Sequence, residues 1–419
     1  MKTFLVLGAG TAGTMIARKM ASHLDAREWK VVLVDKDEKH YYQPGFLFLP
    51  FGMYRAQDVI QPKRKFIPEK VEFIISGIER IEPDASRVKL TNGRTITYDH
   101  MVVATGVDIH PEETEGMLDG GWRTNVFDFY TFEGATALGK FLEKWQGGRM
   151  VVNVVENPIK CPVAPLELLF LADWWFTKRG MRNKVELVYA TPLSGAFTKP
   201  IAADALGAIL KRKNIHVEPD FNIGMVDAGS NVIRSWDERE IPYDLLVTVP
   251  TNMGAEVIGR SGMGDEMNFV AVDKHTLQSQ KWENVWVMGD ANNIPTSKAG
   301  AVIHFQQETV LKNLLAHISG KPITHKFDGH ASCYIESGFN KGVLIDFNYD
   351  QEPLPGKYPL PVVGPFTLLG ETTINHWGKL AFKTLYWNMM LQGIEVPLPN
   401  DFSMAGKKTM SSKSPAPQF

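Results

Sequence analysis

Short apolar runs alternate with longer stretches of helical character along most of the chain. Apolar runs of roughly four to eight residues that alternate with helical patterns are typical of parallel βαβ units. The clearest examples are the expected strand–helix–strand groups 4–7, 14–24 and 30–35, and 150–155, 166–179 and 185–189. The pattern predicts an α/β fold with two tandem Rossmann-like dinucleotide-binding domains.

The order of these groups predicts that the first domain is discontinuous. A strand over 284–291 and a helix over 302–318 follow the second group and are expected to return to the first. The expected parts are a cofactor domain of residues 1–110 with 281–320, a second Rossmann-like domain of residues 111–280, a C-terminal region of residues 321–400, and a disordered polar and basic tail of residues 401–419.

A helix expected over 374–390 is apolar and aromatic almost all around. Trp377 falls on one face, while Phe382, Tyr386 and Trp387 make the opposite side apolar, with lysines between. Such a helix can pack in a core, and it also suits the interface of a bilayer as an amphipathic membrane-associating helix. We place these four aromatic residues at a quinone or membrane surface.

Composition narrows the function classes. The chain has 419 residues, 44% of them hydrophobic and 22% charged, with a net charge of −2. This charge gives no global basic field, so we expect no nucleic-acid partner. We find no signal peptide and no run of the roughly 18 apolar residues that span a bilayer. Two cysteines are too few for a disulfide scaffold.

A glycine-rich turn follows the first strand. Gly8, Gly10 and Gly13 form the pattern G-x-G-x-x-G between a strand and a helix, and the next strand ends in Asp35. The glycines allow a tight turn, close approach of a pyrophosphate, and close packing of helix on strand. Asp35 can accept hydrogen bonds from an unphosphorylated ribose. The spacing predicts a site for FAD or NAD rather than NADP.

A second contact to the cofactor is expected late in the chain. The strand over 284–291 ends in Gly289-Asp290, and Lys298 and Gly300 lie just before the next helix. The acid suits a ribityl chain or a phosphate, and a helix N-terminus directs positive charge at an anionic flavin. Lys298 would strengthen that effect.

Cys161 lies where the second unit should have its glycine-rich turn. The glycines are absent between the strand that ends at Val155 and the helix that begins near Leu166. Side chains at those positions block a pyrophosphate, so this half should have lost its pyridine-nucleotide site. The nearby helix N-terminus is expected to lower the thiol pKa of Cys161.

The chain resembles the sulfide:quinone oxidoreductases and the flavoprotein subunit of flavocytochrome c sulfide dehydrogenase. The resemblance covers residues 1 to about 390. It rests on Gly8 to Gly13, on Ala104-Thr105-Gly106, on Gly289-Asp290, on Cys161 followed by Pro162 and Pro165-Leu166-Glu167, on Cys333, and on the loop Tyr42-Gln43-Pro44-Gly45. Many sulfide:quinone oxidoreductases have a third cysteine before the second unit, and residues 122–134 contain none here.

This resemblance implies a flavoenzyme with FAD and no metal. It implies that Cys161 and Cys333 meet at the flavin as a redox-active disulfide pair, with Glu167 as a proton-handling group or simply a helix N-terminal charge. Further cofactor contacts are expected at Thr11, Ala12, Lys36, Pro44, Ala104, Thr105 and Gly106. The implied reaction is oxidation of hydrogen sulfide to polysulfide or elemental sulfur. The implied acceptor is a quinone, and the enzyme is expected to be a peripheral membrane protein and a homo-oligomer.

Three alternatives stay open. The chain could be an NADH:quinone oxidoreductase on the same fold, a sulfide dehydrogenase subunit that reduces a c-type cytochrome, or an inactive flavoprotein scaffold. The glycine-free turn after Val155 argues against the first, and the cysteine pair argues against the last.

Overall fold

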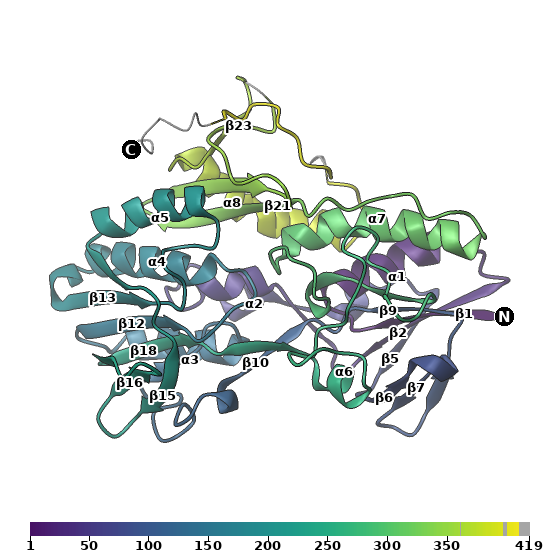
Figure 1. Ribbon diagram of the computed structural model, residues 1–419, viewed down its shortest axis with the longest axis horizontal. Coiled ribbons are helices and arrows are strands. Elements are labelled where there is room, and N and C mark those ends of the chain that lie inside the picture. Colours follow the sequence, from purple (N-terminus) through teal and green to yellow (C-terminus); the bar gives the residue numbers. More distant parts are fainter. Residues whose placement is uncertain (361, 397–399, 410–419) are drawn as a thin grey trace.

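The computed structural model describes residues 1–360, 362–396 and 400–409. Two α/β units lie side by side, and a smaller C-terminal sheet with its helix covers one side of them (Figure 1). Each unit is built on a parallel sheet, so the predicted α/β fold with two Rossmann-like units is confirmed.

The first unit has a five-stranded parallel sheet in the order β20-β9-β1-β2-β5. Its strands are β1 (Lys2–Leu7), β2 (Trp29–Asp35), β5 (Val71–Ile75), β9 (His100–Val103) and β20 (Val285–Val287). The helices α1 (Thr11–His23) and α7 (Gly300–Ile318) pack against each other on one face of this sheet (Figure 1). The smaller elements are α2 (Ala56–Val59), the antiparallel pair β3 (Lys39–Tyr41) and β4 (Ile60–Pro62), and the antiparallel strands β6 (Ile78–Glu82), β7 (Arg87–Leu90) and β8 (Thr95–Thr97).

The burial of the first strand explains the apolar pattern of its sequence. Residues Phe4 to Leu7 are completely buried, because a central parallel strand is covered on both faces. The helix that we expected from Thr14 begins at Thr11 instead. The backbone N–H of Thr14 already donates to the carbonyl of Gly10 at 3.0 Å, so the glycine turn passes directly into α1.

The second unit repeats the architecture with the order β11-β18-β12-β13-β14. Its strands are β11 (Val126–Phe127), β12 (Gly148–Val154), β13 (Val185–Ala190), β14 (Ile215–Glu218) and β18 (Leu245–Val249). Its helices are α3 (Phe132–Leu142), α4 (Ala164–Lys178) and α5 (Pro200–Arg212). A small antiparallel sheet of β15 (Ile223–Asp227), β16 (Val232–Ser235) and β17 (Glu240–Pro242) completes it.

One antiparallel ribbon connects the two units. The strand β10 (Val107–His110) leads into the second unit and pairs with β19 (Thr251–Gly254), which leads out of it. The following helix α6 (Glu256–Arg260) already contacts the first unit, since Arg260 donates to the carbonyls of Ile78 and Glu79. The chain therefore returns near residue 255, earlier than the boundary expected at 281.

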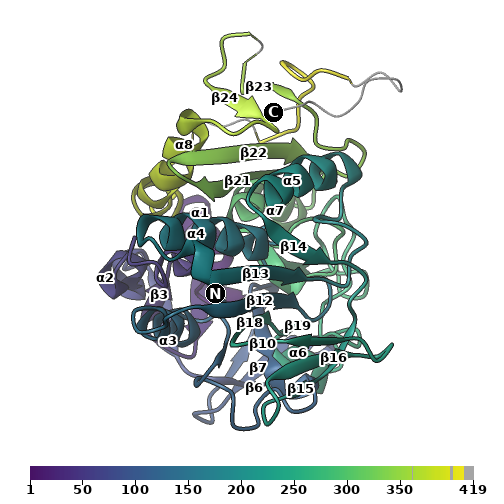
Figure 2. The same ribbon diagram turned by 90° about the vertical axis from the view of Figure 1, so that its left-hand side faces the viewer.

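The C-terminal region is a four-stranded sheet with one helix (Figure 2). The strand order is β21 (Ala331–Gly338), β22 (Lys341–Phe347), β24 (Phe366–Leu368) and β23 (Gly356–Tyr358). The helix α8 (Thr373–Leu385) packs on β21 and β22 and continues as a π-helical turn over Tyr386–Met390. Among the described residues, no helix is both long and apolar enough to cross a membrane.

The first part of the expected disordered tail packs against this sheet. Lys407 is buried, and its Nζ lies 2.7 Å from a carboxylate oxygen of the equally buried Asp346. The backbone N–H of Lys357 donates to the carbonyl of Gly406 at 2.9 Å. A buried ion pair and backbone bonds thus order residues 400–409, which differs from the expectation. Residues 410–419 lie outside the described residues.

Candidate active site

The turn between β1 and α1 leaves open space at Gly10. Gly8 has a φ of 95°, and a Cβ there would lie 2.4 Å from the carbonyl oxygen of Ala104. A Cβ on Gly13 would lie 1.7 Å from the carbonyl oxygen of Gly8, so strand and helix touch. A Cβ on Gly10 would meet no described atom within 4 Å. The N-terminus of α1 therefore faces a space that suits a pyrophosphate.

Asp35 is held beside this turn by two contacts. One carboxylate oxygen accepts from the backbone N–H of Ala9 at 2.5 Å, and the other pairs with the buried Lys63 at 2.6 Å. These contacts fix the carboxylate where a ribose hydroxyl is expected. The neighbouring Lys36 is exposed. Pro44 is the second residue of the short helical turn Gln43–Phe48, which follows β3.

The Gly289-Asp290 turn lies at the end of β20. Gly289 has a φ of 78°, and its N–H donates to the side chain of the buried Gln306 at 2.8 Å. Lys298 is also buried, and its Nζ donates to the carbonyls of Asp290 and Asn292 at 2.9 and 2.7 Å. Burial lowers the pKa of Lys298 to about 8. Lys298 thus braces this turn through its backbone carbonyls.

Several glycines with free space beside them and one unbonded hydroxyl surround a common space, which we call the cofactor cradle. Within the described part of the chain, a Cβ on Gly106 or on Gly300 would meet nothing within 4 Å. The hydroxyl of Thr105 is buried and lacks a hydrogen-bond partner among the same residues. An uncommitted hydroxyl, open glycines and two helix N-termini fit a dinucleotide such as FAD. Ala12, which is buried in the first turn of α1, packs within 3.1 Å of where a Gly289 side chain would begin.

Cys161 lies in a loop over 155–163 that crosses from the second unit to the first. Its φ is 45°, and its N–H donates to the carbonyl of Lys298 at 2.8 Å. The preceding Lys160 donates its N–H to the side chain of Asn252 at 3.0 Å. Tyr130 donates its hydroxyl to the carbonyl of Cys161 at 3.2 Å. This loop takes the place of the glycine turn that a nucleotide site would need.

Both cysteines are free thiols, Cys333 buried and Cys161 half-buried, and the charges of Glu167 and Lys379 influence both. Burial, as the main cause, and the charge of Glu167 together raise the pKa of Cys161 to about 12, while Lys379 opposes the shift. The N–H of Ala164 at the start of α4 lowers this pKa, but the effect of burial is larger, so the net shift is upward and not downward as expected. Cys333 lies on β21, and burial followed by the charge of Cys161 raises its pKa well above the usual range.

A cluster of four ionisable side chains, three of them buried and Lys379 largely so, adjoins the thiols. We call Glu167, Glu336, His376 and Lys379 the charge cluster. One carboxylate oxygen of Glu167 pairs with Lys379 at 2.7 Å and accepts from the backbone N–H of Glu336 at 2.6 Å. The side chain of Glu336 pairs with His376 at 2.7 Å. Among the described residues, the second oxygen of Glu167 is buried without a partner.

Sequence reasoning found only Glu167 in this cluster. Lys379 was placed between the aromatic faces of α8, and neither Glu336 nor His376 was singled out. A usable signal was present, since His376 and Lys379 share one helical face and Glu336 follows Cys333 on the same strand. Their meeting is a tertiary contact, which local patterns do not predict.

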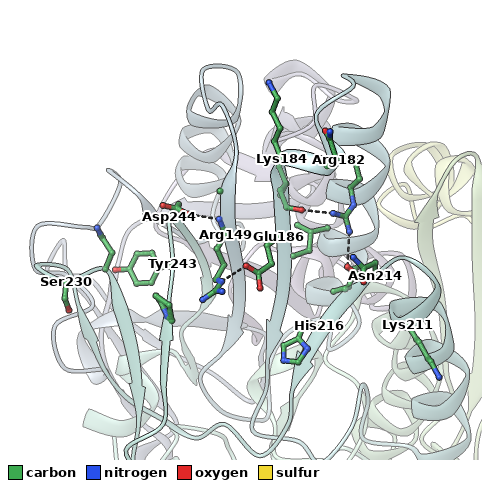
Figure 3. Close-up of a pocket in the computed structure, with 17 residues that line it drawn as sticks. Arg149, Arg182, Lys184, Glu186, Lys211, Asn214, His216, Ser230, Tyr243 and Asp244 are labelled. Carbon is green, nitrogen blue, oxygen red and sulfur yellow. Dashed lines mark hydrogen bonds and ion pairs between the residues drawn. The ribbon is translucent and has the colours of Figure 1, made fainter.

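One surface hollow lies away from the cysteines. It measures about 1020 Å³ and is formed at the amino ends of β12, β13 and β14 (Figure 3). Figure 3 shows the side chain of Arg149 bonded to Glu186, at 2.7 Å, and the side chain of Arg182 bonded to backbone carbonyls. Ligands of open α/β sheets bind at the carboxyl ends of the strands. The hollow is polar and open, and neither cysteine lines it.

Comparison with known proteins identifies the family. The model of the pyridine nucleotide-disulphide oxidoreductases matches residues 2–152. A type II NADH:quinone oxidoreductase of Staphylococcus aureus is 32% identical over 85% of this chain and 92% of its own length. The chain belongs to the pyridine nucleotide-disulphide oxidoreductases.

Within this family, the resemblance found in the sequence is confirmed. The mitochondrial sulfide:quinone oxidoreductase of Mus musculus is 28% identical over 93% of this chain and 86% of its own. The crystal structure of the sulfide:quinone oxidoreductase from Aquifex aeolicus matches with a TM-score of 0.80 at 20% identity, over 94% of this chain and 92% of that one. At 20% identity, the match to the Aquifex aeolicus structure supports the shared fold alone.

In this oxidoreductase, two of the four aromatic residues expected at a membrane or quinone surface are buried. The hydroxyl of Tyr386 lies 2.7 Å from that of Thr11 and 2.6 Å from Nε2 of His40. Trp387 stacks on Phe66, with 5.3 Å between ring centroids. The end of α8 therefore packs into the cofactor unit rather than facing lipid.

The other two aromatic residues differ in exposure. Phe382 is half-buried beside Tyr42, whereas Trp377 is 63% exposed. The burial of Tyr386 and Trp387 differs from the expected membrane surface, because the helical pattern could not show that both sides of the helix end have a partner. Their expected place at a quinone stays a prediction. Trp377 remains available at the surface.

Replacing Tyr386 by phenylalanine should lower the free energy of unfolding by about 1–3 kcal/mol, because Thr11 and the buried His40 lose a partner. The measurement is urea unfolding of the variant and the wild type. Tyr349→Phe is the matched control, since its hydroxyl donates to an exposed carbonyl, that of Lys274, at 2.9 Å. Equal losses in both variants would contradict the assigned role of Tyr386.

Proposed function

We propose that this protein is an FAD-dependent sulfide:quinone oxidoreductase that uses Cys161 and Cys333 as its redox pair. The observation that carries the proposal is the placement of the two thiols. Cys333 is buried and Cys161 half-buried beside one charge cluster, on segments that adjoin the cofactor cradle. The names of the relatives similar over most of the chain support sulfide as donor and quinone as acceptor.

The chemistry begins with the oxidised pair. Hydrosulfide attacks the Cys161–Cys333 disulfide, a sulfur–sulfur bond forms on Cys161, and Cys333 leaves as a thiolate. One sulfide gives up two electrons and a proton overall, and zero-valent sulfur leaves as polysulfide or elemental sulfur. FAD, when bound, would supply the two-electron acceptor for this oxidation, and a quinone, as the final acceptor, would take up the two electrons with two protons.

The charge cluster serves this exchange. The unpartnered oxygen of Glu167 can accept the proton that sulfide or a thiol releases, and burial, the main influence, raises the pKa of this carboxyl. Lys379 places a positive charge close to both sulfurs, which opposes the rise in their pKa values. A thiolate in a buried site needs such a counter-charge.

The quinone would come from a membrane to which the protein binds peripherally. The C-terminal region exposes apolar side chains on the loop between β23 and β24 and on α8, namely Leu360, Val362, Val363, Ile374 and Trp377. Apolar side chains of this kind suit a lipid interface. This surface replaces the buried rings of Tyr386 and Trp387 as the proposed membrane contact.

An anaerobic titration tests the proposed function. Sulfide added to the purified FAD-bound protein should bleach the flavin absorbance near 450 nm, roughly in proportion to sulfide because each sulfide supplies two electrons. A quinone added next should restore the absorbance. Sulfide that leaves the spectrum unchanged would overturn the proposal and favour a scaffold role.

A second candidate function is oxidation of NADH by a quinone, which the Staphylococcus relative favours. We expect NADH to leave the flavin absorbance unchanged under the same anaerobic conditions. The reason is the loop over 155–163, which offers no glycine turn for a pyrophosphate. Rapid bleaching by NADH would show that the second unit still binds this nucleotide.

A further inference from the structure

The loop over 155–163, which carries Cys161, is held on one side by β19. The backbone N–H of Lys160 donates to Oδ1 of Asn252 at 3.0 Å, and Nδ2 of Asn252 donates to the carbonyl of Pro250 at 2.8 Å. Asn252 is completely buried. Only one orientation of its amide satisfies both partners, because the N–H of Lys160 needs an oxygen and the carbonyl needs an N–H. The side chain therefore links β19 to the residue directly before Cys161.

Two further contacts fix the start of this loop. The hydroxyl of the buried Thr251, also on β19, donates to a carboxylate oxygen of Glu156 at 2.6 Å. The N–H of Val155 donates to the carbonyl of Val249, at the end of β18, at 3.0 Å. The loop thus leaves the second unit from a fixed point, and Asn252 supplies the next fixed point, adjacent in sequence to the thiol.

The backbone of Cys161 needs support from its neighbours. Its φ of 45° lies in the left-handed region, which is unfavourable for a residue with a Cβ and persists only where the surroundings hold it. Its N–H donates to the carbonyl of Lys298 at 2.8 Å, and its carbonyl accepts from Tyr130 at 3.2 Å and from the N–H of Ala164 at 2.8 Å. The bond from the preceding N–H to Asn252 completes this set of contacts.

We propose that Asn252 is a positioning residue of the thiol site, which holds Cys161 in the place where it meets Cys333. The role rests on the proposed function, since it assumes that the two thiols act as a pair. Thiol–disulfide exchange depends on geometry, because the two sulfurs must approach to bonding distance in a defined direction. Without the bond to Asn252, the loop gains freedom while Cys333 stays fixed on β21. The thiol of Cys161 then meets water more often and Cys333 less often.

The test measures the alkylation of each thiol in the reduced, FAD-bound protein. Iodoacetamide labelling of Cys161 and Cys333 is quantified by peptide mass spectrometry at one pH. In Asn252→Ala, we expect Cys161 to label about tenfold faster, which corresponds to a fall of about one pKa unit. The reason is that water reaches the released thiol and removes part of the burial that raises its pKa. Cys333 should keep the labelling rate of the wild type and serves as the internal reference.

A conservative variant separates positioning from general stability. Asn252→Asp has nearly the same shape and keeps an oxygen acceptor for the N–H of Lys160, so Cys161 should label close to the wild-type rate. A role in stability alone predicts the opposite order, since burying a carboxyl group costs more than burying the methyl group of alanine. Asn313→Ala is the matched control, because the equally buried amide of Asn313 bonds both backbone groups of His325, in another loop, at 2.9 and 3.1 Å. It should leave the labelling of Cys161 unchanged.

The outcomes decide separately on the two proposals. Labelling of Cys161 in Asn252→Ala that is no faster than in the wild type, or labelling in Asn252→Asp as fast as in Asn252→Ala, would overturn the role of Asn252. The labelling uses no sulfide, so it stays decisive if sulfide fails to bleach the wild-type flavin, a failure that would refute the proposed function instead. If Asn252→Ala does not fold, hydrogen exchange of the wild type takes its place. Exchange of the Lys160 N–H as slow as that of β12 supports the bond to Asn252, and exchange as fast as that of exposed loops refutes it.

Discussion

Replacing either Cys161 or Cys333 by serine is expected to abolish sulfide-dependent quinone reduction while FAD stays bound. Serine is nearly the same size, so the buried site keeps its packing. Its hydroxyl can neither form the sulfur–sulfur bond nor leave as an anion near neutral pH. We expect turnover to fall by at least about a thousandfold, measured as the absorbance change of a soluble quinone under anaerobic conditions.

The control for these variants is chemical reduction of the flavin. Dithionite bypasses the thiols, so it should bleach Cys161→Ser and Cys333→Ser like the wild type, and a quinone should then reoxidise them. This combination would place the defect in the sulfide half of the reaction. Full sulfide-dependent activity in either serine variant would contradict the two-thiol scheme.

The second large effect is expected in the glycine turn, where two single-methyl changes should act differently. Gly13→Ala drives a Cβ to within 1.7 Å of the Gly8 carbonyl oxygen, so α1 must move away from β1. We expect the free energy of unfolding of the FAD-free protein to fall by about 3 kcal/mol or more. Thermal unfolding of the FAD-free protein measures this loss.

Gly10→Ala is the matched variant. Its Cβ meets no described atom within 4 Å, so the FAD-free protein should unfold within a few degrees of the wild type. The same methyl group would occupy the space through which a pyrophosphate approaches. FAD affinity should fall by at least about tenfold in a fluorescence titration. An FAD affinity of Gly10→Ala equal to that of the wild type would contradict the placement of the cofactor at this turn.

The sequence predicted those parts of the fold that local rules determine. Gly8, Gly10 and Gly13 are read from their spacing, because a tight turn between strand and helix imposes it. The continuous apolar runs of the parallel strands are equally local. The chain was expected to return to the first unit at residue 281 and not near 255. The sequence does not reveal the earlier return, because it depends on hydrogen bonds from Arg260 to the carbonyls of Ile78 and Glu79, which are distant in the sequence.

The candidate site was less accessible to sequence reasoning for the same reason. Cys161 stood out because a glycine turn was expected there, and Cys333 because of the family resemblance. The sequence does not indicate Glu336 and His376 as site residues, because they come together only when β21 and α8 pack against each other. The burial of Tyr386 was not expected, since its partners Thr11 and His40 belong to the first unit. The roles of the cysteines and of Glu167 stay predictions until the variants are measured.

The ribbon of β10 and β19 has a consequence for how such a protein can change. The chain enters and leaves the second unit through neighbouring strands, with Asp108 paired opposite Met253. An insertion whose two ends are adjacent can be exchanged without breaking the host fold. The cofactor unit can therefore accept a different inserted domain between residues 110 and 251. Such a domain could supply the flavin with another electron donor.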